Sequence, residues 1–138
     1  MAAVLVHIDL DGERPHRSSL VALAAGRLVA SSWGATLYAA VIVHDPSPQA
    51  PEPGTGWCPV ARVPGDPRAI EAVRAALARG GADKIVATVT SATVAPRWSA
   101  VGTAWVGVLD RLRPRLILFG ADAPSAHELG ARTGARLG

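Results

Sequence analysis

The sequence predicts a three-layer α/β fold in which a mostly parallel sheet has helices on both faces. Short apolar runs alternate with longer segments whose apolar residues recur at helical spacing. The order β-α-β-α-β-α-β-α implies right-handed crossovers and parallel strands. The runs are apolar throughout, as expected of strands covered on both faces. The 138 residues are of a size for a single domain, residues 1–138.

The first half of the chain predicts two strands joined by a helix. Its elements are, in order, a strand Ala3–Ile8, a helix from Ser18 or Ser19 to about Ser32, and a strand Ala35–Val43. The Asp11-Gly12 pair predicts a turn after the first strand. Either serine is a candidate N-cap, and Gly34 follows the helix where a positive φ is often required.

Residues 44–66 predict a proline-rich loop within the domain. His44–Pro64 contains six prolines, together with Trp57 and Cys58. Proline removes an amide donor and disfavours helix in the residue before it. We therefore expect an irregular surface segment there.

The second half repeats the strand and helix alternation. Its elements are a helix Ala69–Arg79, a strand Lys84–Thr90, a helix from Pro96 to Leu112, a strand Arg115–Gly120 and a helix from about Ser125 to Leu137. Asp66 and Pro67 are a typical N-cap and first helical residue.

Composition excludes several classes of function. The net charge is +3, and the arginines form no one-sided stripe with interleaved aromatic residues, which disfavours nucleic-acid binding. The N-terminus lacks a basic segment and a long apolar run, so it does not predict a signal peptide, and no stretch is long enough to span a membrane. Cys58 is the single cysteine, so no disulfide within the chain is expected. We expect a cytoplasmic protein.

In a parallel sheet of this kind, ligands bind beyond the carboxyl ends of the strands, where the strand order reverses. The candidate segments are His7–Asp11, His44–Pro46, Thr88–Thr90 and Gly120–His127. They contain neither a GxGxxG fingerprint nor a P-loop, and no glycine-rich loop ending in Ser or Thr follows the fourth strand.

The last of these segments predicts a self-capped helix. Ser125 and Glu128 have the spacing of a capping box, and Glu128 and Asp122 place negative charge near the helix N-terminus. Because these side chains would occupy the amides that an anion needs, we favour a structural cap over a phosphate site.

Other reactive side chains have structural explanations. His7, His44 and His127 follow different strands and would need further ligands to hold a metal, so we assign no metal site. A turn-forming role for Asp9 and Asp11 is favoured over acid–base catalysis. Cys58 lacks a close basic neighbour, so we expect no nucleophile there and assign no catalytic residue.

Most of the tryptophans also have a structural explanation. Trp33, Trp98 and Trp105 lie on predicted helices or at their ends, where packing is expected, whereas Trp57 is the better candidate for an exposed contact.

Three phrases together resemble the N-terminal domain of the electron transfer flavoprotein alpha subunit. They are VLVHID at the first strand, GGADKIVAT at Gly80–Thr88, and RPRLILFGAD with ELGARTGARLG within Arg113–Gly138. The resemblance covers nearly the whole chain and implies a Rossmann-like, adenine nucleotide alpha hydrolase-like fold. Asp9 stands where the family usually has Glu, Asp122-Ala123 replaces Thr-Ser, and Arg132 and Arg136 are kept.

The resemblance implies cofactor and partner expectations. None of the family's FAD-binding segments is present, so no cofactor is expected on this chain alone, with FAD and AMP belonging to the complete assembly. The expected partner is a beta-like subunit or a separate flavin domain, with a homo-oligomer as the alternative. In that family, further strands follow the last helix, so the resemblance implies an unfinished sheet edge here. A partner chain or a second copy would cover that edge. The candidate cofactor-binding residues are Asp9, Asp122, Ser125, His127 and Arg132.

Three functions follow as hypotheses. The leading one is an alpha-like subunit that serves as a protein-binding platform in flavin-dependent electron transfer, without catalytic activity of its own. The second is a small adenine-nucleotide-binding domain that uses Asp9 and Asp122. The third is a structural accessory subunit that docks through the 44–66 loop.

Overall fold

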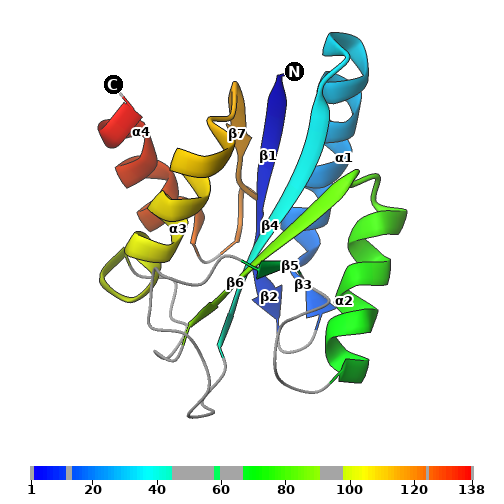
Figure 1. The fold of residues 1–138 in the computed structure, drawn as a ribbon, viewed down its shortest axis with the longest axis horizontal. Helices are drawn as coiled ribbons and strands as arrows, with labels where there is room; N and C mark the ends of the chain where they lie inside the picture. The colour runs from blue at the N-terminus through cyan, green and yellow to red at the C-terminus, as the bar shows by residue number, and fades with distance from the viewer. Residues whose placement is uncertain are drawn as a thin grey trace.

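A five-stranded sheet forms the centre of the computed structural model, which describes residues 2–11, 14–44, 58–59, 67–90, 98–123 and 125–137. Its strand order is β5-β6-β4-β1-β7 (Figure 1). The strands are β1 Ala3–Ile8, β4 Thr36–His44, β5 Cys58–Pro59, β6 Lys84–Thr90 and β7 Leu116–Leu118. β1, β4, β6 and β7 run parallel, which confirms the predicted sheet.

Helices cover both faces of this sheet, so the three-layer prediction is confirmed. Figure 1 shows α1 (Arg17–Trp33) and α2 (Pro67–Arg79) on one side and α3 (Trp98–Leu112) and α4 (Ala131–Leu137) on the other. The residues of β1 point alternately into the two layers, and all six of them are buried. Val4 and Val6 belong to the core under α1 and α2, whereas Leu5 packs with Trp105 of α3.

The start of α1 differs from the prediction. His16 is the N-cap, and its Nδ1 accepts a hydrogen bond from the backbone amide of Ser18 at 3.2 Å. Neither Ser18 nor Ser19 caps the helix, because both lie inside it. The far end is as predicted, with Gly34 at φ 61°.

The proline-rich segment contains a strand that the sequence pattern does not predict. β5 pairs antiparallel with β6, with Cys58 opposite Ala87 and Pro59 opposite Val86. Residues 45–57 and 60–66, including Trp57 and the predicted Asp66 cap, lie outside the described part of the chain. A short antiparallel pair, β2 (Leu10–Asp11) with β3 (Arg14–Pro15), flanks the predicted turn.

The last predicted helix is divided in two. A π-helical turn, η2 (Ala126–Gly130), precedes α4. Among the described residues, no helix is both long and apolar enough to cross a membrane.

Candidate functional site

The strand order reverses between β1 and β7, which makes the carboxyl ends of these two strands the expected ligand position. β1 continues through α1 to β4 on one side, whereas the chain reaches β7 from β6 through α3 on the opposite face (Figure 1). Asp9 follows β1 directly, and Ser125 lies in the segment after β7. The fold thus brings together two residues that the sequence singles out.

Ser125 binds the carboxylate of Asp9. Its Oγ lies 2.6 Å from Oδ1 and 2.5 Å from Oδ2, so the hydroxyl proton is shared between the two carboxylate oxygens. Nδ1 of His7 lies 3.2 Å from the same Oγ and 3.7 Å from Asp9 Oδ2. Because the serine gives its proton to Asp9, the Nδ1–H of His7 donates to the serine oxygen.

The carboxyl end of β1 is held in place by the start of α1. The amide of Asp9 donates to Oγ of Ser19 at 3.0 Å, and the amide of His16 donates to the carbonyl of Asp9 at 2.8 Å. The start of α1 therefore fixes the backbone of Asp9, and Ser125 fixes its side chain.

Aromatic rings hold His7 from the other face. Its ring is edge-on to Trp105, with centroids 4.9 Å apart, and stacks on Phe119 at 5.6 Å. Trp105 is fully buried, as predicted for packing, and its Nε1 donates to Oγ1 of Thr133 at 2.8 Å. Trp33 is instead partly exposed, with the guanidinium of Arg115 4.3 Å over its ring.

Asp9 is ionised in this setting. Burial by itself would raise the pKa of the carboxyl group, but the hydrogen bonds from His7 and Ser125 outweigh burial and hold the pKa below its ordinary value. The carboxylate is thus a fixed negative charge at the switch point.

The cluster resembles a Ser-His-Asp set in composition but not in geometry. A nucleophilic serine must give its proton to the histidine, whereas Ser125 gives it to Asp9. Ser125 is also only 2% exposed, which keeps substrates away from its oxygen. The arrangement is suited to binding and orientation rather than to acyl transfer.

This geometry corrects the predicted capping box. Ser125 makes no side-chain hydrogen bond to the helix that follows, because its hydroxyl is bound to Asp9. The predicted hydrogen bond from the Glu128 amide to the Ser125 side chain is therefore wrong.

The described residues contain no set of side chains that could bind a metal ion. No three His, Cys, Asp or Glu side chains gather there as a metal ion would require. His7 is buried and His127 exposed, and the side chain of His44 lies outside the description.

A hollow of about 490 Å³ opens between α1 and β7, and one of its lining residues is Phe119, which stacks on His7. Its polar residues are at the start of α1 and just after β7: His16, Arg17, Ser18 and Asp122. Its apolar residues continue along the two elements: Val21, Ala22, Ala25, Leu118 and Phe119. The hollow thus joins a polar end to an apolar wall.

The remaining predicted residues divide between this hollow and the solvent. Asp122 lines the hollow, whereas His127 and Arg132 are exposed and do not line it. Nε of Arg132 lies 3.5 Å from Oε1 of Glu128, one helical turn away. The sequence analysis did not single out His16 and Arg17. Their position, directly before and at the start of the first helix, is the feature that could have identified them.

No protein-family model matches the sequence, and no curated protein matches it. Among solved structures, the chain is similar to a protein of the universal stress protein family from Burkholderia pseudomallei, with 17% identity and a TM-score of 0.49 over 95% of this chain and 89% of that one. It is also similar to a universal stress protein solved in complex with cAMP, with 21% identity and a TM-score of 0.49 over 98% of this chain and 88% of that one.

The resemblance to the electron transfer flavoprotein alpha subunit is corrected by these findings. The structures reported above are universal stress proteins, and no family model supports the flavoprotein assignment. The phrases that suggested it form β1, the turn into β6, and β7 with the helix after it. Such strand and turn sequences suit many parallel sheets covered on both faces, so they do not distinguish one family from another.

Proposed function

We propose that the chain is a small-ligand-binding domain for an adenine nucleotide, bound at the carboxyl ends of β1 and β7. The observation that carries the proposal is the hollow at the switch point between α1 and β7, whose lining combines Arg17 and Asp122 with an apolar wall. A volume of 490 Å³ falls within the usual range for small-molecule sites.

The lining favours a nucleotide with one phosphate. The apolar wall, which includes Phe119, suits a flat base, and Asp122 offers acceptors for ribose hydroxyls. Arg17 supplies one guanidinium for an anion. A triphosphate would bring more negative charge than this lining offsets, since Asp9 and Asp122 are themselves acidic.

The proposal keeps Asp9, Asp122 and Ser125 as site residues and adds His16 and Arg17. Ser125 would act through Asp9, because it is buried and bound to that carboxylate. No catalytic step is included. A cytoplasmic location is part of the same proposal and rests on Cys58, the single cysteine of the sequence, which leaves no disulfide within the chain.

Thermal unfolding with added ligands tests this proposal. AMP at 100 times its dissociation constant should add about 2.7 kcal/mol to the free energy of unfolding. We expect stabilisation by AMP, a weaker effect of ATP and none of FAD. Arg17→Ala should weaken AMP binding, whereas Arg136→Ala, an exposed arginine of α4, serves as the matched control.

Two outcomes count against the proposal. Absence of a shift with AMP, cyclic AMP, adenosine and ATP would remove nucleotide binding. Equal losses from Arg17→Ala and Arg136→Ala would move the ligand away from the hollow.

A further inference from the structure

Basic side chains gather at one end of the molecule, opposite the proposed nucleotide site. The helices run back along the sheet, so their carboxyl ends lie beside the amino ends of the strands (Figure 1). Backbone hydrogen bonds join the segments there: the amide of Arg115 donates to the carbonyl of Ala3, and the amide of Asp83 donates to that of Leu37. We call this end the basic pole, after its exposed basic residues: Arg79, Lys84, Arg111, Arg113, Arg115 and Arg136.

Few acidic residues offset the charge of the basic pole. Oδ1 of Asp83 lies 2.8 Å from a guanidinium nitrogen of Arg27, so this pair adds no net charge. Asp110 is the other acidic residue that the described part of the chain places there. Other acidic residues lie at the carboxyl ends of the strands: Asp9, Asp11 and Asp122. The net charge of +3 is therefore unevenly distributed between the two ends of the molecule.

The helix dipoles explain only part of this cluster. The last turns of α2, α3 and α4 each contain one of the arginines, where a cation offsets the partial negative charge of the helix end. Lys84, Arg113 and Arg115 lie outside the helices, at the start of β6 and in the segment that leads into β7. Arg79, Arg113 and Arg136 form no ion pair with any described residue. The pole thus has more positive charge than the helix ends require.

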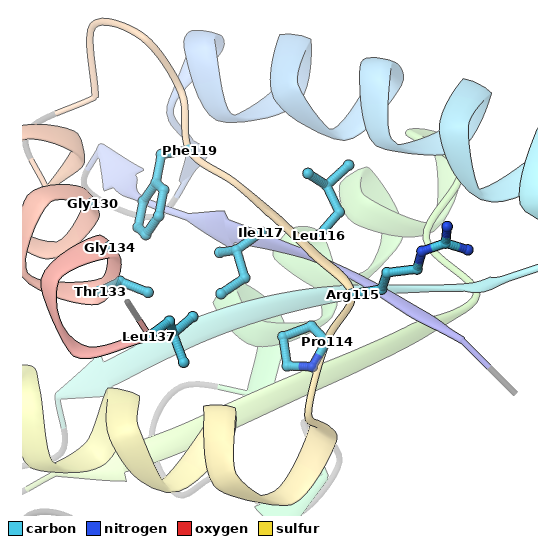
Figure 2. A pocket seen from close by; sticks show the side chains of 9 residues that line it. All are labelled: Pro114, Arg115, Leu116, Ile117, Phe119, Gly130, Thr133, Gly134 and Leu137. Carbon is cyan, nitrogen blue, oxygen red and sulfur yellow. The ribbon is translucent and has the colours of Figure 1, made fainter.

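Exposed apolar side chains lie at the same pole. Trp33 ends α1 and is 41% exposed, and Leu137 ends α4 and is 62% exposed. The guanidinium of Arg115 lies 4.3 Å over the ring of Trp33, and Figure 2 shows this arginine pointing away from Leu137. Surfaces that bind at the membrane–water interface combine aromatic, aliphatic and cationic groups in this way.

We propose that the basic pole binds the surface of a membrane that contains anionic lipids. Each basic residue close to such a surface strengthens binding by about fivefold, so several weak contacts together hold the protein. Trp33 and Leu137 enter the headgroup region beside the arginines. The proposed nucleotide site lies at the other end of the molecule, so it faces away from the lipid and stays open to its ligand.

Nucleic acid fits the same charges less well. The pole presents the ends of helices, whereas the major groove admits the side of a helix or a two-stranded ribbon. Single strands are bound through aromatic faces on which bases stack. At this pole cations lie over the rings, with Arg115 over Trp33 and Nζ of Lys84 5.9 Å over Tyr38. A membrane surface requires neither a groove nor a free ring face.

Co-sedimentation with lipid vesicles tests the proposal. We expect the 138-residue chain to bind vesicles of phosphatidylglycerol and phosphatidylcholine in equal parts, and to bind vesicles of phosphatidylcholine alone much more weakly. Raising the ionic strength from about 0.1 M to about 1 M shortens the Debye length from about 10 Å to about 3 Å, which should release the protein. Failure to bind the anionic vesicles would overturn the proposal.

Variants with equal changes in charge test the location. Arg79→Gln with Arg113→Asn should weaken vesicle binding by at least about tenfold. Asparagine suits position 113 because Arg113 has φ 44°, a conformation that asparagine adopts more readily than most residues. Arg14→Gln with Arg132→Gln is the control, since it removes the same charge from exposed positions of β3 and of the start of α4. Equal losses in the two double variants, both folded by circular dichroism, would overturn the assignment to the basic pole.

Fluorescence quenching tests the orientation. Lipids with brominated acyl chains should quench Trp33 in the bound protein, and Trp33→Phe should lose this quenching while it keeps an aromatic ring at the interface. Trp105 is fully buried and should not respond. Equal quenching of both proteins would overturn the proposed orientation. Binding of duplex DNA or of RNA without binding of vesicles would assign the pole to nucleic acid instead and would overturn the membrane proposal. None of these results bears on the thermal shifts expected with AMP.

Discussion

At the scale of single residues, the most consequential contact is the hydroxyl of Ser125 on the carboxylate of Asp9. Ser125→Ala should cost about 2 kcal/mol at neutral pH, because hydrogen bonds to charged groups contribute about 1.5–3 kcal/mol. The Asp9 side chain is 12% exposed, so water replaces the lost bond poorly. Urea unfolding should show this loss, whereas Ser32→Ala, at an exposed helical position, should change stability by less than about 0.5 kcal/mol.

The pH dependence of this loss has a definite sign. The folded-state pKa of Asp9 lies below the ordinary value of 3.8, so the stabilisation is complete above that value and is lost as the pH falls through the folded pKa. Asp83 contributes in the same direction, because the amide of Leu37, and after it Arg27, lowers its pKa. The cost of Ser125→Ala should therefore shrink in acid. An equal cost at neutral and acidic pH would contradict this account of the carboxylate.

At the scale of elements, the end of β7 approaches the first turn of α1 very closely. A Cβ on Gly120 would lie 2.6 Å from the carbonyl carbon of Ser18 and 2.7 Å from the amide nitrogen of Ser19. These are backbone atoms, so no side-chain rotation relieves the clash. Gly120→Ala should destabilise the domain by about 3 kcal/mol, at the upper end of overpacking costs.

Gly134 provides the matched control on α4. A Cβ there would meet nothing within 4 Å, so Gly134→Ala should stabilise by about 0.5–1 kcal/mol through helix propensity. The two midpoints of urea unfolding should move in opposite directions. If Gly120→Ala proves neutral, the close contact between β7 and α1 is not rigid.

The elements also show how far sequence reasoning reaches. β1 and β6 have the predicted bounds because their apolar runs are bordered by turn residues, and Gly34 ends α1 because the chain there needs a left-handed residue. β5 was not predictable, since two residues carry no periodicity and form a strand only through pairing with β6. Only the tertiary structure, through the pairing with β6, identifies β5 as a strand.

The candidate site was only partly predictable, because its geometry also depends on contacts between distant parts of the chain. Asp9 and Ser125 were both candidates, because residues after parallel strands meet at one edge. Their mutual contact spans 116 positions, and local spacing favoured Glu128 as the partner of Ser125 instead. A local pattern such as the capping box competes with a distant contact that no single sequence reveals.

At the scale of the whole molecule, the sheet is asymmetric in the part that the structure describes. β1 and β4 lie inside it with partners on both sides, whereas β7 pairs with β1 alone. Amide hydrogen exchange should therefore be faster in Leu116–Leu118 than in Ala3–Ile8, because an edge strand has a partner strand on one side only. The amides of Ala3–Ile8 should be among the slowest, because β1 lies between β4 and β7.

A comparison of the two strands in denaturant tests the edge position of β7. An edge strand opens locally, so its amides exchange without unfolding of the domain, whereas the amides of an inner strand exchange through larger openings. Urea below the unfolding midpoint should therefore speed exchange in Ala3–Ile8 more than in Leu116–Leu118, because the larger opening exposes more surface. Equal exchange rates and equal urea dependence in the two strands would mean that β7 opens only together with β1, which would contradict its position as an edge strand.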